Sequence, residues 1–200
     1  MNIEKLERSL RSNRFGFSYV ETKEEALELV KSMIHENDLV GVGGSVTLKE
    51  CNIIDYLENR EDIQFLNRKN YEDYNEMYKK AFDADIYLTS TNAITMDGEL
   101  YNVDGNGNRV AAMIYGPKKV IVVTGKNKIV ENVEEAVKRN EEICAVKNSI
   151  RLNKGNPCEK VGHCVHCKSP SRICRAYTVI GFNRTFERIH IILVNEDLGY

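Results

Sequence analysis

The sequence predicts an α/β fold with a mostly parallel sheet and helices on both of its faces. Short apolar runs rich in Val and Ile recur along the chain, which is typical of buried strands. Amphipathic stretches of about 10–15 residues separate these runs and have the spacing of helices. Strands and helices that alternate in this way form right-handed β-α-β units on a parallel sheet. The 200 residues, of ordinary globular composition, suffice for one large domain.

The first half of the chain supplies four of the expected strands. Ile3, Leu6 and Leu10 share one face of a helix over the first twelve residues. Thr22 and Glu25 have the spacing of a capping box, so we expect a second helix to begin there. The expected strands cover residues 15–21, 38–42, 63–66 and 85–89, and further helices are expected at 48–57 and 71–82.

The second half continues the pattern. A strand over residues 119–124 precedes a helix over 132–144, and a second helical stretch runs to about residue 152. Residues 101–109 are rich in Gly and Asn and are expected to form a loop. Two final strands are expected at 177–182 and 188–194. We therefore expect a single α/β domain over residues 1–200, with a cysteine-rich metal-binding insertion over residues 156–175.

The charge and hydropathy exclude two classes of partner. The net charge of −2 gives no general attraction for nucleic acid or for anionic membranes. The apolar runs are too short to span a bilayer, so no membrane insertion is expected. The charged N-terminal segment lacks the apolar stretch of a secretory signal. We therefore expect a cytoplasmic protein, in which disulfides do not persist.

The last quarter of the chain contains four of its six cysteines, in the segment PCEKVGHCVHCKSPSRIC. Thiolates spaced this closely in a reducing compartment usually share a metal. One C-x2-C pair flanked by single cysteines fits a [4Fe–4S] cluster, and zinc is the alternative. Free thiols or a redox disulfide are the third interpretation. The expected metal ligands are Cys158, Cys164, Cys167 and Cys174.

The other cysteines and the histidines of this segment are given lesser roles. His163 and His166 lie beside ligand cysteines and could be outer groups of the site. Cys51 and Cys144 fall on apolar helical patterns and are expected to be buried structural thiols.

A glycine turn, GVGGSVT, follows the strand at residues 38–42. Gly43, Gly44, Ser45 and Thr47 could present backbone N–H groups and hydroxyls to an anion at the start of a helix. The alternative is a plain strand-to-helix turn in which Ser45 caps the helix.

A second polar region runs over residues 91–109. Asp97, Asp104, Asn106, Asn108 and Arg109 could together hold a sugar or an anionic group. Arg109 could bind a carboxylate or phosphate with two parallel hydrogen bonds, and Asp104 could serve as a general base. A complex turn held by Asn and Asp side chains is the alternative.

Four blocks of the sequence resemble the lactate-utilisation (LUD) domain family. They are the GVGGSVT turn, the stretch from Asn92 that reads NAITMDGELYNVDGNGNRVAAMIYGPKKVIVV, the cysteine segment PC…GHC..CKSPSRIC, and the closing RIHIILVNEDLGY. The resemblance implies a fold similar to ribose-5-phosphate isomerase, glucosamine-6-phosphate isomerase and the CoA transferases. It implies a ligand at the glycine turn and the loops beside it, which include Asn92. The D-G-x-x-x-N pattern from Asp97 to Asn102 is similar to one in methylthioribose-phosphate isomerase-like proteins, which adds Asn102 to the expected site.

The resemblance implies a component of an organic-acid redox system, with a [4Fe–4S] cluster, a small anionic metabolite as ligand and redox partner subunits. One alternative is a non-redox isomerase or transferase that acts on a sugar phosphate or small acid, with structural zinc on the cysteines. Another is a ligand sensor or scaffold subunit without catalysis. Tyr71, Tyr74 and Tyr78 have helical spacing and could belong to the core or to a homodimer interface.

Overall fold

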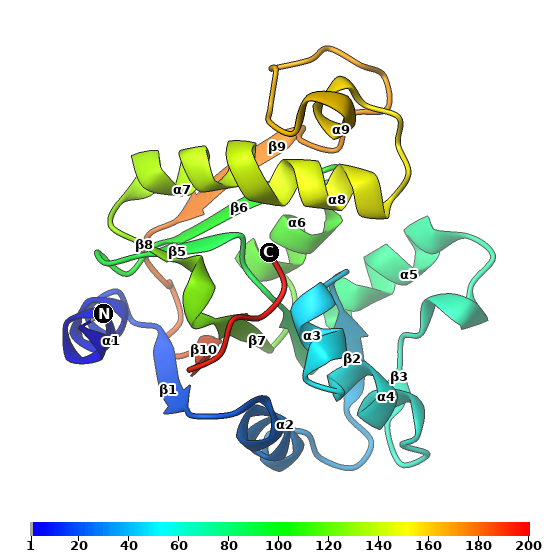
Figure 1. The fold of residues 1–200 in the computed structure, drawn as a ribbon. Helices are drawn as coiled ribbons and strands as arrows, with labels where there is room; N and C mark the ends of the chain where they lie inside the picture. The colour runs from blue at the N-terminus through cyan, green and yellow to red at the C-terminus, as the bar shows by residue number, and fades with distance from the viewer. Residues whose placement is uncertain (1) are drawn as a thin grey trace.

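The computed structural model describes residues 2–200 and has a parallel six-stranded sheet at its centre (Figure 1). The strand order is β1-β10-β7-β4-β2-β3, and every paired neighbour is parallel. This confirms the expected α/β class and the parallel sheet. The strands are β1 (Gly16–Val20), β2 (Leu39–Val42), β3 (Gln64–Phe65), β4 (Ile86–Thr89), β7 (Lys119–Gly125) and β10 (Ile189–Val194).

Strand β7 shows why the sheet is buried on both faces. Val120 and Val122 point to one core cluster, whereas Ile121 and Val123 point to the other. Successive side chains of a strand alternate between the two faces, so a continuous apolar run fills both cores at once.

Helices α2 (Lys23–Ser32), α3 (Val46–Glu50) and α4 (Ile53–Glu58) cover one face. The Thr22 hydroxyl accepts from the Glu25 backbone N–H at 3.2 Å, as a capping residue does. The helix expected at residues 48–57 is broken in two, because Asn52 has a φ of 55°. Asn tolerates this left-handed conformation better than most residues, and the chain turns there.

The other face is covered by α1 (Ile3–Ser12), α5 (Tyr74–Lys80), α6 (Asn108–Ile114) and a second sheet. Helix α5 begins at Tyr74, later than expected, because residues 68–70 form a separate 3₁₀ turn. Tyr71 and Tyr78 pack against the core, whereas Tyr74 is 49% exposed.

The second sheet has the order β8-β5-β6-β9, and its strands are β8 (Ile129–Val130), β5 (Ala93–Thr95), β6 (Leu100–Asp104) and β9 (Ala176–Ile180). The expectation of a loop over residues 101–109 was therefore wrong at both ends, because the chain is in β6 up to Asp104 and helix α6 begins at Asn108. Strands β5 and β6 form an antiparallel hairpin, in which Ile94 and Leu100 are fully buried against the first sheet.

A long helix lies over the outer face of this second sheet (Figure 1). It consists of α7 (Val133–Arg139), a π-helical turn (Asn140–Cys144) and α8 (Ala145–Arg151). The cysteine segment with α9 (Pro157–Val161) leads from α8 back to β9. Across residues 2–200, none of the helices has the length and apolar character that crossing a membrane requires.

Candidate functional site

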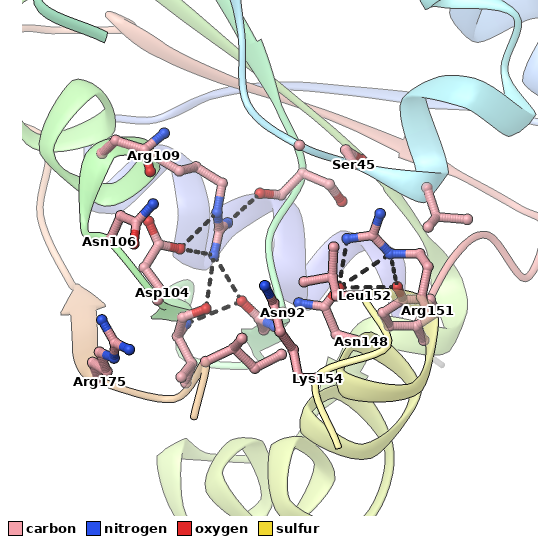
Figure 2. A pocket seen from close by; sticks show the side chains of 18 of the residues that line it. Ser45, Asn92, Asp104, Asn106, Arg109, Asn148, Arg151, Leu152, Lys154 and Arg175 are labelled. Atoms are coloured by element: carbon pink, nitrogen blue, oxygen red, sulfur yellow. Dashed lines mark hydrogen bonds and ion pairs between the residues drawn. The ribbon is translucent and has the colours of Figure 1, made fainter. Parts of the chain in front are cut away.

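A pocket of about 620 Å³ opens where several strands end (Figure 2). The residues that follow β2, β4 and β7 line it, together with the β6–α6 connection. These three strands are parallel, so their carboxyl ends meet at one edge of the sheet, where ligands of α/β proteins bind. The end of α8 and the cysteine segment close the pocket from the other side.

The glycine turn contributes Gly44, Ser45 and Thr47 to the pocket. The Ser45 hydroxyl accepts from the backbone N–H of Leu48 at 3.2 Å, so it caps α3. Helix α3 has five residues, and its dipole sums over few peptide units. The start of this short helix therefore offers an anion little attraction of its own. Gly43 lies beneath the pocket lining, where a Cβ would meet the Thr89 hydroxyl at 2.8 Å.

Lys128 supplies a buried positive charge at the floor of the pocket. It lies in the 3₁₀ turn (Lys126–Lys128) after β7 and is 3% exposed. Its ammonium donates to the Thr47 hydroxyl at 2.9 Å and to the Ser90 hydroxyl at 3.0 Å. Burial, and secondarily the charge of Arg139, lowers the pKa of Lys128 to about 8. No carboxylate within residues 2–200 forms an ion pair with it.

Arg109 and Asp104 form a buried ion pair, with 2.7 Å between Arg109 Nη2 and Asp104 Oδ1. The second carboxylate oxygen of Asp104 accepts from the backbone N–H of Val110 at 3.0 Å. The guanidinium also donates to the Ser90 carbonyl at 2.8 Å and to the side-chain oxygens of Asn92 and Asn102. Figure 2 shows these hydrogen bonds around Arg109. The pair thus ties the β4–β5 connection, strand β6 and helix α6 together, and both of its members are already bonded within the protein.

The expected Asn and Asp residues divide into two groups. Asn92, Asn106 and Asn108 line the pocket. Asn102 lies just behind it, fully buried, and its side-chain amide nitrogen has no hydrogen-bond partner among residues 2–200. Asp97 lies outside the pocket lining, in the β5–β6 turn that packs against α1, where its carbonyl accepts from the Asn13 side chain at 2.9 Å.

Arg139 supports the site from behind. Its guanidinium donates to the Asn92 carbonyl at 2.7 Å and lies 2.8 Å from the Cys144 sulfur. Cys144 and Cys51 are each 1% exposed, as expected for structural thiols. Burial raises the pKa of Cys51 to about 12, so this thiol stays protonated at neutral pH.

The four cysteines of the C-terminal segment all line one small cavity. Cys158 is 7% exposed, and the other three are partly buried. Burial raises the pKa of Cys158 and of Cys174, and the neighbouring thiols raise them further. Without a bound cation these thiols therefore favour their neutral form. A metal ion would reverse that preference, because thiolates are its ligands.

A second set of ligand atoms lies at the edge of this cavity. The side chains of Glu141, Cys164 and His166 place three such atoms within 4.8 Å of one another. In the described part of the chain no other group of three is this close. It contains only one of the four cysteines.

The cysteine cavity and the pocket are neighbours that share a wall. Arg172 and Ile173 line both of them. The Arg172 Nη2 donates to the Tyr177 hydroxyl at 3.2 Å, whereas its buried Nε has no partner within residues 2–200. The position of the cysteine segment against the pocket could not be predicted from the spacing of its residues.

The pocket lining is strongly basic. Among the described residues that line it, the one acidic side chain is Asp104, which is paired with Arg109. The basic residues of the lining are Arg68, Arg109, Lys128, Arg151, Lys154, Arg172 and Arg175. Of these seven residues, Arg109 alone was predicted from the sequence to belong to the site. Lys128 follows the strand expected at residues 119–124, and Lys154 follows the helical stretch expected to end near residue 152. Residues just past such elements at the edge of the glycine turn are candidates for a ligand site, and this signal could have identified both lysines.

The fold and the site define an α/β protein with a basic pocket at the carboxyl edge of a parallel sheet. The family model of the LUD domain matches residues 3–194, so the chain belongs to the LUD domain family. The crystal structure of a DUF162 family protein from Deinococcus radiodurans at 1.70 Å resolution is similar, with a TM-score of 0.56 and 16% identity over 96% of each chain. At this identity the likeness shows the fold alone. No curated protein matches the sequence.

Proposed function

We propose that this LUD protein is an electron-transfer component of an organic-acid redox system, of the lactate-utilisation type. In this proposal Cys158, Cys164, Cys167 and Cys174 hold a [4Fe–4S] cluster, and the basic pocket binds a small anionic acid. The observation that carries it is the shared wall: Arg172 and Ile173 separate the cysteine cavity from the pocket. An electron carrier would then lie directly beside the bound acid.

The arrangement of the cysteines fits a cluster better than a single zinc ion. A tetrahedral zinc with Zn–S bonds of about 2.3 Å would bring its sulfurs to about 3.8 Å from one another. Among residues 2–200, the three-atom group within 4.8 Å includes Cys164 alone of the four. A cubane is larger and accepts more widely spaced thiolates. The buried, unpartnered Nε of Arg172 supports the same assignment, because N–H donors to sulfur tune such clusters.

The residues of the pocket would bind and orient the acid. The Lys128 ammonium, with Thr47 and Ser90, offers a buried positive end for a carboxylate. When bound, the cluster would pass single electrons to a redox partner subunit. Oxidation of a 2-hydroxy acid releases two electrons and two protons, so we assign this chain the transfer of electrons and not the whole reaction.

The deciding experiment is metal analysis of protein purified without air. We expect about four irons with matching sulfide per chain, and visible absorption that bleaches on reduction. Replacing any one of the four cysteines by Ala should lower the iron content. Cys51→Ala and Cys144→Ala are matched controls that should retain it. A colourless protein with zinc in excess of iron would contradict the proposal.

A second candidate is a non-redox isomerase or transferase with structural zinc, in which Asp104 is the base and Arg109 the anion anchor. The close group of Glu141, Cys164 and His166 favours it, since Cys, His and Glu are all zinc ligands. Here His166→Ala should lower the zinc content, whereas in the cluster proposal it should leave the iron unchanged. Asp104→Asn should then abolish turnover of a candidate sugar phosphate while affinity persists.

A further inference from the structure

We infer that the pocket takes a ligand with two separated acidic groups, one of them a phosphate, and that the basic residues at its mouth form the second subsite. The inference rests on the proposed anion pocket and names the class of its ligand. One acidic group would lie at the floor, against Lys128. The other would lie against the rim, defined as Arg151, Lys154, Arg172 and Arg175.

Two segments form the rim, and both lie later in the sequence than Lys128 at the floor of the pocket. Arg151 and Lys154 come from the end of α8 and the residues after it, and Arg172 and Arg175 from the cysteine segment. Figure 2 shows Arg151 on the Ser45 side of the pocket and Arg175 on the opposite side, near Asn106. The two segments thus offer positive charge from both sides of the opening.

The rim cations lack acidic partners within residues 2–200. Arg151 donates only to neutral oxygens, of Asn148 and Tyr200. Arg175 donates to the carbonyls of Pro170 and Arg172. Lys154 forms no ion pair in the described chain. Unpaired like charges that line one pocket repel one another, so a bound anion would relieve that repulsion.

The positive charge of the pocket and its volume both exceed what a simple carboxylic acid needs. Of the seven basic residues of the pocket, only Arg109 forms an ion pair with an acidic side chain of residues 2–200, in a chain whose net charge is −2. The volume of 620 Å³ falls in the range of about 300–1,000 Å³ that suits drug-sized ligands, well above a three-carbon acid. Arginine-rich sites favour phosphate, which accepts paired hydrogen bonds from guanidinium groups.

The test uses two probes that differ in one group. Glycerate carries a carboxylate, and 3-phosphoglycerate adds a phosphate at the other end. Calorimetric titration of the anaerobically purified protein, at matched ionic strength, should give an affinity for 3-phosphoglycerate at least about tenfold above that for glycerate or inorganic phosphate. Equal affinities for the three probes would overturn the inference.

Variants separate the two subsites. The double variant Arg151→Gln/Lys154→Gln should reduce the affinity for 3-phosphoglycerate about tenfold and leave that for glycerate within about twofold. Lys118→Gln, which removes an exposed lysine outside the pocket lining, is the charge control and should change neither. A loss with Lys118→Gln as large as that with the rim variant would indicate non-specific charge attraction and overturn the inference.

The same titrations distinguish the two proposals. If glycerate binds and the iron is present but the phosphate adds no affinity, the second subsite is wrong and the proposed function stands. If none of the three probes binds to the iron-loaded protein, the anion pocket itself is wrong, and the inference is overturned with it.

Discussion

The ammonium of Lys128 lies 2.9 Å from the hydroxyl of Thr47, a residue 81 positions earlier in the chain. The two meet because β2 and β7 end at the same edge of the sheet. A hydroxyl partner satisfies a hydrogen bond of the ammonium without neutralising its charge. Lys128 therefore keeps a buried charge that no carboxylate within residues 2–200 neutralises, which lowers the stability of the protein at neutral pH.

Replacing Lys128 by Met should stabilise the protein and abolish anion binding. The unfolding free energy at pH 7 should rise by about 1–3 kcal/mol, since each unit by which burial lowers a lysine pKa corresponds to about 1.4 kcal/mol. The hydroxyls of Thr47 and Ser90 keep a contact with each other at 3.5 Å. Urea unfolding and a glycerate titration measure the two effects. A destabilised variant that still binds glycerate would contradict this assignment of Lys128.

Anion affinity should depend on pH through the same residue. The pKa of Lys128 is lowered to about 8, so its positive charge is present below that pH and is lost above it. The affinity for glycerate should fall by up to about tenfold per pH unit above pH 8. Without ligand, the stability contribution of Lys128 is lowest below pH 8 and rises as the pH increases toward its unfolded pKa of about 10.4. Glycerate titrations of the unmodified protein from pH 6.5 to 9.5 measure this fall, and a constant affinity across that range would contradict the role of Lys128.

Gly43 and Gly44, which are adjacent in the glycine turn, allow a matched pair of substitutions. A Cβ on Gly43 would lie 2.8 Å from the Thr89 hydroxyl and 3.0 Å from Cγ of Arg109, whereas a Cβ on Gly44 meets nothing within 4 Å. Gly43→Ala should cost about 1–3 kcal/mol of unfolding free energy, because the bonded Arg109 cannot move freely. Gly44→Ala should be close to neutral. Thermal and urea unfolding of the two variants would test this. Equal stabilities would show that the aliphatic part of the Arg109 side chain moves aside to make room for the added Cβ.

Asp104→Asn should destabilise the protein by about 2–4 kcal/mol, because it leaves the Arg109 charge without its buried counterion. The side chains of Arg109 and Asp104 are 12% and 6% exposed. The matched control is Glu7→Gln, which removes the exposed partner of Arg11 on α1 and should cost about 0.5 kcal/mol or less. Urea unfolding compares the two. A loss at Asp104 no larger than at Glu7 would mean that the pair does not hold the β4–β5 connection, β6 and α6 together.

The regular part of the fold could be predicted from the sequence, since its signals are local. Apolar runs marked β2, β4, β7 and β10, and the Thr22 capping box marked the start of α2. The hairpin of β5 and β6 was missed, because Asn and Asp side chains gave it the composition of a loop. Its polar residues are instead bonded to Arg109, which lies on α6.

The site was predictable where its residues are close in sequence. The four cysteines were grouped by spacing alone, and the glycine turn by its motif. Lys128 and Arg139 carry no such local mark. Their importance arises from burial without a carboxylate partner, which depends on how distant strands pack. The shared wall at Arg172 likewise exists only once the cysteine segment folds back against the sheet.

The π-helical turn between α7 and α8 determines the direction in which the side chains of α8 point relative to those of α7. Each residue of a helix advances it by about 100°, so the wide turn rotates α8 relative to α7 compared with an unbroken α-helix. The carbonyl of Glu141, within that turn, accepts from the backbone N–H of Cys164 at 2.9 Å. Deleting Glu142 would restore regular winding and swing Asn148 and Arg151 away from the pocket, while Arg139 stays behind the site. A single residue of helix register thus decides which side chains the second half of this helix presents to a ligand.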